Sequence, residues 1–205
     1  MRAPVDLAHA SRLINHGPTV LVSSAHGAQR NVMAAAWSMP VEFTPPRVAV
    51  EIDKSTFTCA LVRDSGVFAL SVPGRALADL TFTVGSVSAR DFGDGRAPHD
   101  KFTRYGIGTF AGPVLGLPLV EGCVAWLECR VTPEAHVQHT YDTWYAEVVS
   151  AQADPRVFAN GRWSFRDDNA ALHTIHHLGA GQFAPAGASI AARVLDPDRG
   201  AGPRA

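Results

Sequence analysis

The sequence predicts a mainly β fold with short helices, built as a closed antiparallel barrel. About six apolar or β-branched runs follow one another at fairly regular spacing, and turn residues join several of them as hairpins. Only two or three short helical patterns interrupt these runs, which favours a barrel over a doubly wound parallel sheet. We find no repeat and no linker. Residues 1–205 are therefore predicted to be one domain, with a core at about 16–187 and a disordered tail at about 190–205.

The composition is that of an ordinary globular protein. The chain has 205 residues, 46% of them hydrophobic, and a formal charge of −1 at pH 7. That charge gives no reason to expect nucleic acid as a partner. Three widely spaced cysteines do not indicate a disulfide framework, and we see no signal peptide and no apolar run long enough to span a membrane. We therefore expect a cytoplasmic enzyme or redox protein.

The first half of the chain combines strand-like runs with one capped helix. Strands are expected at residues 19–24, 31–38, 41–43, 47–52 and 67–72. The first two flank a Gly-containing turn and should form a hairpin. A helix is expected over 55–64, with Ser55 as its N-cap and Gly66 at its end. Before them, residues 5–16 have the pattern of a short helix with Leu7, Leu13 and Ile14 facing inward.

The second half has a weaker pattern. Helices are expected at residues 76–84 and 100–105, with a long polar loop at 85–98 between them. A loop of that length in a compact domain is usually functional. Strands at 120–131 and 141–149 are expected to pair antiparallel across a turn at 133–139. Residues beyond 153 show little regular pattern.

Two short runs carry the chemistry. The run Asn31-Val32-Met33-Ala34-Ala35-Ala36-Trp37 has small side chains that leave the backbone open to a flat ligand. The run Asp53-Lys54-Ser55-Thr56-Phe57-Thr58 opens a helix, where unpaired N–H groups and the positive end of the dipole favour an anion. Its hydroxyls and its ammonium group add donors. We expect the first run to hold the ring of a phosphorylated cofactor and Lys54, Ser55 and Thr58 to hold its phosphate.

Several other motifs are weaker. His173, His176 and His177 lack a supporting carboxylate or thiolate, so no metal site is predicted. The stretch 179–184 matches a dinucleotide fingerprint in letters only, because we expect no strand before it and no helix after it. The three cysteines are expected to be buried and inert, and His136 and His139 to face solvent.

The order of motifs resembles the flavin reductase-like, flavoredoxin-type proteins, which are FMN-binding split β-barrels with an antiparallel, Greek-key-like sheet. The likeness covers about residues 16–187. It is carried by residues 19–24, Asn31 to Trp37, residues 45–50, Lys54 to Thr58, residues 66–73, Asp100-Lys101-Phe102 and residues 177–183. Ala34 departs from the pattern, because many relatives have threonine there. The loop at 90–98 is also longer.

The resemblance implies a homodimer that binds FMN non-covalently near the subunit interface. It also implies hydride transfer from NADH or NADPH through the flavin to free flavin, iron or a protein acceptor. His177 would border the face where donor or acceptor enters, as an acid–base or hydrogen-bonding group. The expected cofactor-binding residues are Asn31, Val32, Met33, Ala34, Ala35, Ala36, Trp37, Lys54, Ser55, Thr58, Ser86, Ser88 and Lys101.

The sequence leaves the activity open between two classes. One is an NAD(P)H-dependent flavin reductase, in which the flavin does the chemistry and the protein positions it. The other is an electron-carrying or non-catalytic FMN protein of the flavoredoxin type. A relative of the pyridoxamine-phosphate oxidases is a weaker third reading, because the chain shows no basic cluster for a second phosphate.

Overall fold

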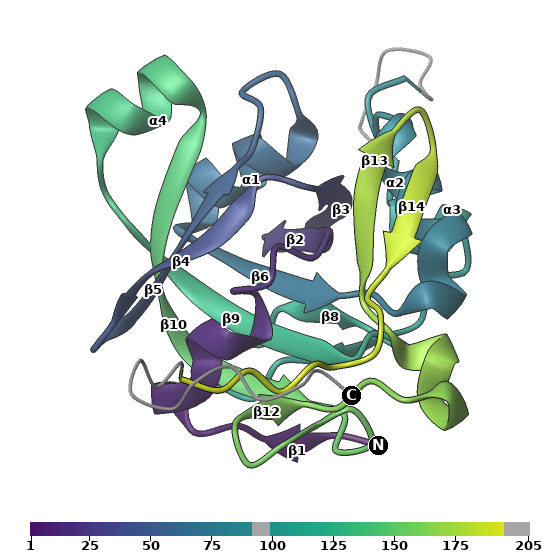
Figure 1. Cartoon of the computed structure of the whole chain (residues 1–205). Helices are drawn as coiled ribbons and strands as arrows, with labels where there is room; N and C mark the ends of the chain where they lie inside the picture. The colour runs from purple at the N-terminus through teal and green to yellow at the C-terminus, as the bar shows by residue number, and fades with distance from the viewer. Residues whose placement is uncertain (92–98, 195–205) are drawn as a thin grey trace.

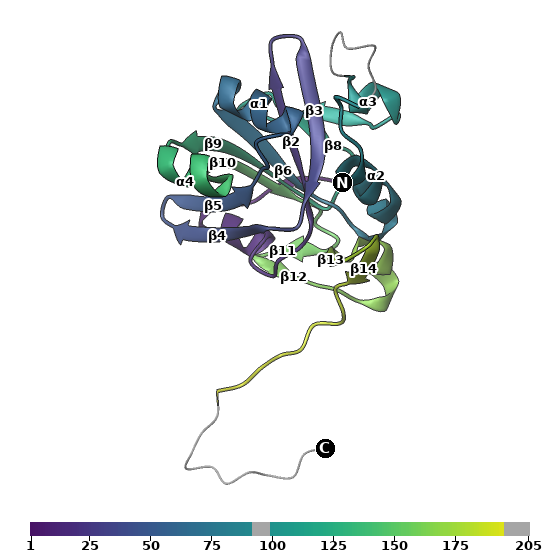
Figure 2. The same ribbon diagram turned by 90° about the horizontal axis from the view of Figure 1, so that it is seen from above.

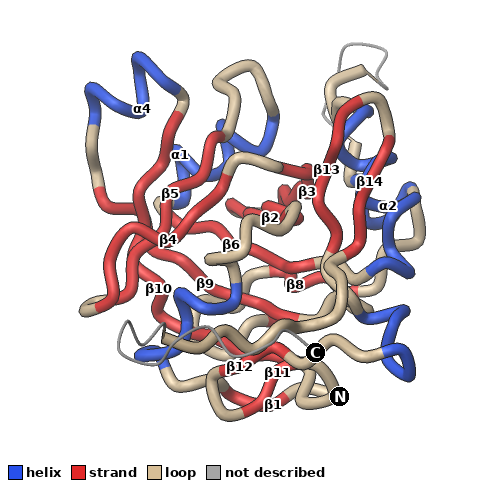
Figure 3. The backbone as a smooth tube through the Cα atoms, viewed as in Figure 1, coloured by secondary structure: helices blue, strands red, loops and turns tan. Residues whose placement is uncertain are grey.

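The structure is a computed structural model that describes residues 1–91 and 99–194. A curved antiparallel sheet forms its body, with the strand order β3-β2-β6-β9-β10-β5-β4, and β1 pairs with β10. Figures 1 and 3 show how this sheet wraps into an open barrel with helices around its rim. The main strands are β1 (Ala3–Pro4), β2 (Val20–His26), β3 (Gln29–Ala35), β4 (Ser38–Phe43), β5 (Pro46–Glu51), β6 (Val67–Val72), β9 (Ala125–Thr132) and β10 (Thr143–Ala153). The predicted mainly β, split-barrel fold is confirmed.

Short helices and small hairpins complete the described chain. The helices are η1 (Leu7–Leu13), α1 (Phe57–Ser65), η2 (Arg75–Leu77), α2 (Ala78–Ser86), α3 (Lys101–Arg104), α4 (Ala135–Tyr141) and η3 (Asp167–Leu172). The hairpins pair β7 (Thr109–Ala111) with β8 (Pro118–Val120), β11 (Phe158–Ala159) with β12 (Arg162–Trp163), and β13 (Ile175–Gly179) with β14 (Gln182–Pro185).

The predicted N-terminal hairpin is present as β2 and β3, which pair from Val20↔Ala35 to His26↔Gln29. Gly27 has a φ of 58°, the left-handed conformation that a tight hairpin turn requires and that glycine adopts without strain. Within the sheet, β3 pairs only with β2, so its outer edge is free of strand partners in the part that the structure describes. Helix α2 lies beside that edge (Figure 1).

Helix α1 begins two residues later than predicted. Thr56, not Ser55, is the N-cap, and its Oγ1 accepts a hydrogen bond from the Cys59 backbone N at 3.1 Å. Ser55 lies one residue earlier, where its backbone N donates to Asp53 Oδ1 at 2.7 Å. The predicted end is correct, because Gly66 closes the helix with a φ of 70°.

Other boundaries differ where tertiary contacts overrode local pattern. The predicted strand 120–131 is two strands, β8 and β9, separated by a turn at 121–124. The predicted turn at 133–139 holds helix α4, on which His136 and His139 are exposed as expected. The predicted strand 31–38 ends at Ala35, and Leu7, expected to face inward, is exposed.

The core explains why the sheet is apolar on both faces. One cluster of buried side chains, including Val22, Val48 and Leu127, fills the barrel, and a second, including Val32 and Trp126, lies beneath the β7–β8 hairpin and α2. The three cysteines are buried and free, and burial raises the pKa of the Cys123 and Cys129 thiols.

The chain leaves the barrel after β14. Ala186 is still bonded to Thr174, whereas residues 187–194 run away from the barrel as exposed, irregular chain, and the rest of the predicted tail, 195–205, lies outside the described residues (Figure 2). Among the described residues, none of the helices has the length and apolar character that crossing a membrane would take.

Candidate functional site

A trough runs between the free edge of β3, helix α2 and the start of helix α1. It consists of two cavities of ≈ 250 Å³ and ≈ 150 Å³ that share Gly85 and Ser86 as lining residues. We call the larger cavity, next to the start of α1, the helix end. We call the smaller one, next to the β13–β14 hairpin, the hairpin end.

At the helix end, a buried amide orients a buried hydroxyl. Asn31 Nδ2 donates a hydrogen bond to Thr58 Oγ1 at 2.9 Å, and both side chains are buried. Because the Thr58 oxygen already accepts from Asn31, its own hydrogen is free to be donated into the cavity. Asn31 Oδ1 accepts no hydrogen bond from any residue that the structure describes. Buried polar atoms are normally paired, so this oxygen indicates a missing donor.

Lys101 supplies the positive charge at the helix end. Its side chain is only 3% exposed, and its Nζ donates to the Val84 carbonyl at 2.8 Å. Among the described residues, no carboxylate lies within ion-pair distance of this ammonium group. Burial lowers the pKa of Lys101 to about 8, against a smaller opposing effect of Asp91. A buried cation without an anion partner is costly, so this end of the trough is suited to an anionic group.

The remaining wall of the helix end is polar as well. Thr56, Thr58, Ser86 and Ser88 line it, together with the first turn of α1. The N–H groups at a helix start have no partner within the helix, and they favour negative charge. Asp91 also lines the cavity, but its Oδ2 accepts a hydrogen bond from the Ser88 backbone N at 3.1 Å.

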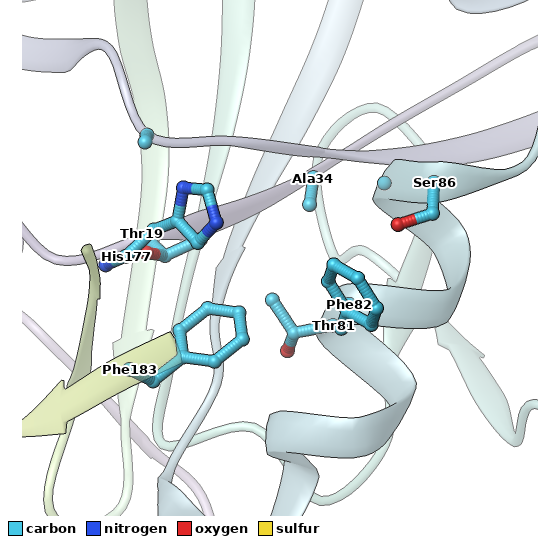
Figure 4. Close-up of a pocket in the computed structure, with 9 residues that line it drawn as sticks. Thr19, Ala34, Thr81, Phe82, Ser86, His177 and Phe183 are labelled. Carbon is cyan, nitrogen blue, oxygen red and sulfur yellow. Dashed lines mark hydrogen bonds between the residues drawn. The ribbon is translucent and has the colours of Figure 1, made fainter. Parts of the chain in front are cut away.

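The hairpin end has a different character. Phe82 of α2 and Phe183 of β14 lie on opposite sides of the cavity, and Thr81 lies between them (Figure 4). The His177 ring extends toward Ala34 from the adjacent wall, 5.2 Å from the Phe183 ring. The His177 backbone N donates to Thr19 Oγ1 at 3.0 Å, which ties the hairpin to β2.

Small residues let α2 approach the edge of β3 closely. A Cβ atom built on Gly85 would lie 3.0 Å from the Ala34 Cβ, closer than side chains normally pack. The sequence departure at Ala34, where many relatives are expected to carry threonine, therefore lies opposite a glycine. The pair leaves the backbone of β3 accessible along the trough.

The structure brings together most, but not all, of the residues that sequence reasoning selected. The lining residues of the trough include Asn31, Met33, Ala34, Ala36, Thr58, Ser86, Ser88, Lys101 and His177. Val32 and Ala35 instead point into the two core clusters. Trp37 is 76% exposed and lines a separate cavity beside β4. The part of the predicted loop that falls on 92–98 lies outside the described residues.

Lys54 and Ser55 do not line the trough. Lys54 Nζ lies 3.2 Å from Asp142 Oδ1 and donates to the His139 carbonyl, so it joins the start of α1 to the end of α4. With Glu51 and Asp53, Asp142 forms a group of three nearby carboxylates, and burial followed by these neighbours raises the pKa of Glu51. Lys54 balances part of this negative charge.

The remaining histidines of the C-terminal group have structural partners. His173 is buried, and its ring nitrogens contact the Ala186 carbonyl at 2.8 Å and the Arg166 carbonyl at 2.9 Å. His176 Nδ1 contacts the Gly17 carbonyl at 2.9 Å. The dinucleotide fingerprint is absent at 179–184, because the segment is the turn of the β13–β14 hairpin, although a strand does precede it.

Five residues of the hairpin end were missed: Thr19, Thr81, Phe82, Gly85 and Phe183. Thr19 and Phe183 lie within segments that carry the family resemblance, but nothing in their local sequence shows whether they line a cavity or pack in the core. Phe82 offered a usable sequence signal, because it lies off the face that Leu77, Leu80 and Val84 form at helical spacing, and the structure leaves it exposed.

Comparisons with known proteins agree with this geometry. Residues 12–169 match the model of the flavin reductase like domain. A protein of Escherichia coli (strain K12) named YddH is 55% identical over 192 residues, which is 92% of this chain and 97% of that protein.

Two solved structures illustrate the range of the likeness. The FMN-binding domain of a flavin reductases-like enzyme from Shewanella baltica OS155 has a TM-score of 0.88 at 41% identity and covers 94% of this chain and 98% of that one. The flavoredoxin of Desulfovibrio vulgaris (Miyazaki F) has a TM-score of 0.70 at 21% identity, covering 89% and 93%. The second likeness concerns the fold alone.

Proposed function

This chain belongs to the flavin reductase-like family, and from that premise we propose that it is an FMN-binding oxidoreductase, specifically an NAD(P)H-dependent flavin reductase. The observation that carries the proposal is the buried Lys101, which lacks an anionic partner among the described residues and faces the same cavity as Thr58 and the start of α1. A phosphorylated cofactor would supply that partner.

The trough fits FMN from end to end. At the helix end, Lys101, Thr58 and the N–H groups of α1 would hold the phosphate. Asn31 Oδ1, which lacks a described donor, would accept a hydrogen bond from a ribityl hydroxyl. The free edge of β3 would offer backbone groups to the ring system near Ala34. On this assignment Lys54 and Ser55 contribute little.

The hairpin end would be the reacting end. Bound FMN would accept hydride from the nicotinamide and pass the electrons on, which is chemistry that amino-acid side chains do not provide. Phe82 and Phe183 would exclude water from this cavity, and Thr19 would hold the hairpin so that His177 keeps its place. The His177 imidazole would donate a hydrogen bond or hold a proton for the incoming partner.

We also propose a homodimer, with the face of β4 as its interface. Large apolar side chains gather there and are exposed in the single chain: Trp37, Met39 and Tyr141. Exposed apolar groups of this size usually mark an interface. Light scattering should give twice 21.8 kDa. Met39→Glu should give the monomer mass, and Phe82→Glu, also exposed but outside this face, should leave the dimer intact.

A flavoredoxin-type electron carrier is the second candidate, because the same bound FMN would also serve electron exchange with a partner protein without a nicotinamide donor. A pyridoxamine-phosphate oxidase type of activity is less supported, because Lys101 is the only lysine or arginine among the described lining residues of the trough. A cytoplasmic location is proposed on the three buried free cysteines.

Two measurements test the proposed function. The absorption spectrum of the purified protein should show oxidised flavin, or the apoprotein should bind FMN in a titration. Stopped-flow mixing of the FMN form with NADH and with NADPH should then show bleaching of the flavin band. Bleaching by neither donor, with FMN bound, would exclude the reductase and leave the electron carrier. Failure to bind FMN would overturn both.

A further inference from the structure

A second cavity lies at the C-terminal end of α1, whereas the trough lies at its start. It has a volume of ≈ 490 Å³, within the range of small-molecule sites, and α1, β9, α4 and β10 enclose it. None of its described lining residues lines the trough. It is therefore a separate feature from the proposed flavin site.

The polar groups of this cavity are mainly hydrogen-bond donors. Trp144 of β10 is 5% exposed, and its Nε1 has no hydrogen-bond partner among the described residues. The indole N–H has only the Cys59 sulfur within weak hydrogen-bonding reach among the described residues, and sulfur is a poor acceptor that a carboxylate oxygen would replace. Gln138 Nε2 of α4 is likewise buried without a described partner. Two buried donors on one cavity indicate an acceptor that the chain itself does not provide.

The charged group of the described lining is a cation, although Asp53 and Asp142 lie close enough outside it to raise the pKa of the Cys59 thiol and are partly balanced by Lys54. Arg63 of α1 stands at the exposed rim, where its guanidinium meets the Cys59 sulfur at 3.7 Å and pairs with no carboxylate of the described chain. His139 of α4 is the other ionisable group of the lining, and no acidic residue belongs to the described lining. An anionic ligand would thus meet a guanidinium, an indole N–H and an amide.

The rest of the lining is apolar. Val62, Val131, Pro133 and Ala135 form it, so a ligand here needs an apolar body as well as an anionic group. A bare phosphate would leave these side chains uncovered and would find a single guanidinium at an exposed rim. We propose that this cavity is a binding site for a small organic carboxylate, with the carboxylate held by Arg63, Gln138 and Trp144.

Benzoate is a suitable probe, used with the full chain as isolated. Calorimetric titration should show saturable binding, whereas benzyl alcohol and inorganic phosphate should bind far more weakly. Arg63→Gln, an exposed change, should weaken benzoate binding by about tenfold through loss of a charge-assisted bond. Arg75→Gln, an exposed arginine on η2 outside this cavity, is the matched control and should change nothing.

Trp144→Phe is the second variant, since it keeps an aromatic ring in the core and removes the N–H donor. It should weaken benzoate binding several-fold, and Arg63→Gln keeps the test valid if this variant is unstable. The proposal is overturned if benzoate shows no saturable binding, or if Arg63→Gln and Trp144→Phe both bind benzoate as tightly as the parent. It is also overturned if phosphate binds the parent as tightly as benzoate does. Competition between added FMN and benzoate would also overturn it, because it would place benzoate in the trough. Benzoate binding that added FMN does not change would support the proposal, and this result does not depend on whether the chain is a reductase.

Discussion

The two ends of the trough are built by opposite means. The helix end depends on buried, mutually bonded polar groups, with Lys101 at 3% exposure and Asn31 bonded to Thr58 at 2.9 Å. The hairpin end depends on exposed aromatic side chains and on His177, held by one backbone hydrogen bond to Thr19. From this difference we infer that the helix end determines the affinity for the cofactor and the hairpin end determines the reaction rate. Changes at the helix end should alter cofactor binding, and changes at the hairpin end should alter rates.

The largest effect is expected at Lys101. Lys101→Met removes the buried charge, so FMN affinity should fall by about 100-fold, the loss of a charge-assisted contact in a desolvated site. The apoprotein should not lose comparable stability, because its buried ammonium group has no anionic partner among the described residues. Fluorescence titration of the apoprotein with FMN, beside urea unfolding, separates the two effects. A variant that binds FMN like the parent would remove Lys101 from the site.

The pH dependence of the same contact has a definite sign. The pKa of Lys101 is lowered to about 8 in the free protein, so the ammonium group is present below that pH and lost above it. FMN affinity should therefore be steady between pH 6.5 and 7.5 and should decline above about 8. Lys101→Met should show no such decline.

His177 should give the next largest effect, on rates alone. His177→Ala is expected to keep FMN bound and to slow the half-reactions by roughly tenfold or more, the low side of what a positioned acid–base group supplies. His176→Ala is the matched control, because its ring contacts the Gly17 carbonyl instead of lining the cavity. Stopped-flow rates equal to the parent's from pH 5.5 to 8 would show that His177 is only a wall of the cavity.

Thr58 and Ser55 provide a sharper test within the helix end. Thr58→Ala should weaken FMN binding by several-fold to tenfold, since it removes a donor to a charged group. Ser55→Ala should have little effect, because Ser55 is exposed and lies outside the trough. Equilibrium titration of both apoproteins compares them directly. Equal losses of FMN affinity in the two variants would support the phosphate site that the sequence alone predicts, which includes Ser55 as well as Thr58.

The same contrast explains what the sequence could predict. The polar start of α1 was predictable because its signal is local: hydroxyls at the beginning of a helix. Asn31 is not part of that signal, because it lies on β3, 27 residues before Thr58. The direction of Lys54 was not predictable, because Asp142 at the end of α4 draws it away. The hairpin end was not predictable from pattern, because β13 is anchored by Thr19, 158 residues before His177, and its walls come from α2 and β14. The match to the family model likewise ends at residue 169, before this hairpin.

The smallest expected effect concerns the stability of the hairpin end in acid. His16 lies under the hairpin, with its Nε2 2.8 Å from Thr174 Oγ1 and its ring 5.7 Å from that of His176. Burial, with a lesser contribution from His176, lowers the pKa of His16 to about 4. The unfolded chain therefore takes up this proton at a higher pH than the folded one, and stability is lost as the pH falls below about 6.5 and levels off below about 4.

The expected loss from this group is about 1 kcal/mol between pH 7 and pH 5.5. His16→Phe should reduce it, since an aromatic ring keeps the contact with Trp163 and does not titrate. His136→Gln, on the exposed face of α4, should leave the acid sensitivity unchanged. Urea unfolding at several pH values measures the three proteins together. If His16→Phe loses stability with acid as steeply as the parent, the acid sensitivity of the fold lies elsewhere. If it does not, the two ends of the trough respond to opposite changes in pH: acid weakens the support of His177, and alkali weakens the hold of Lys101 on the cofactor.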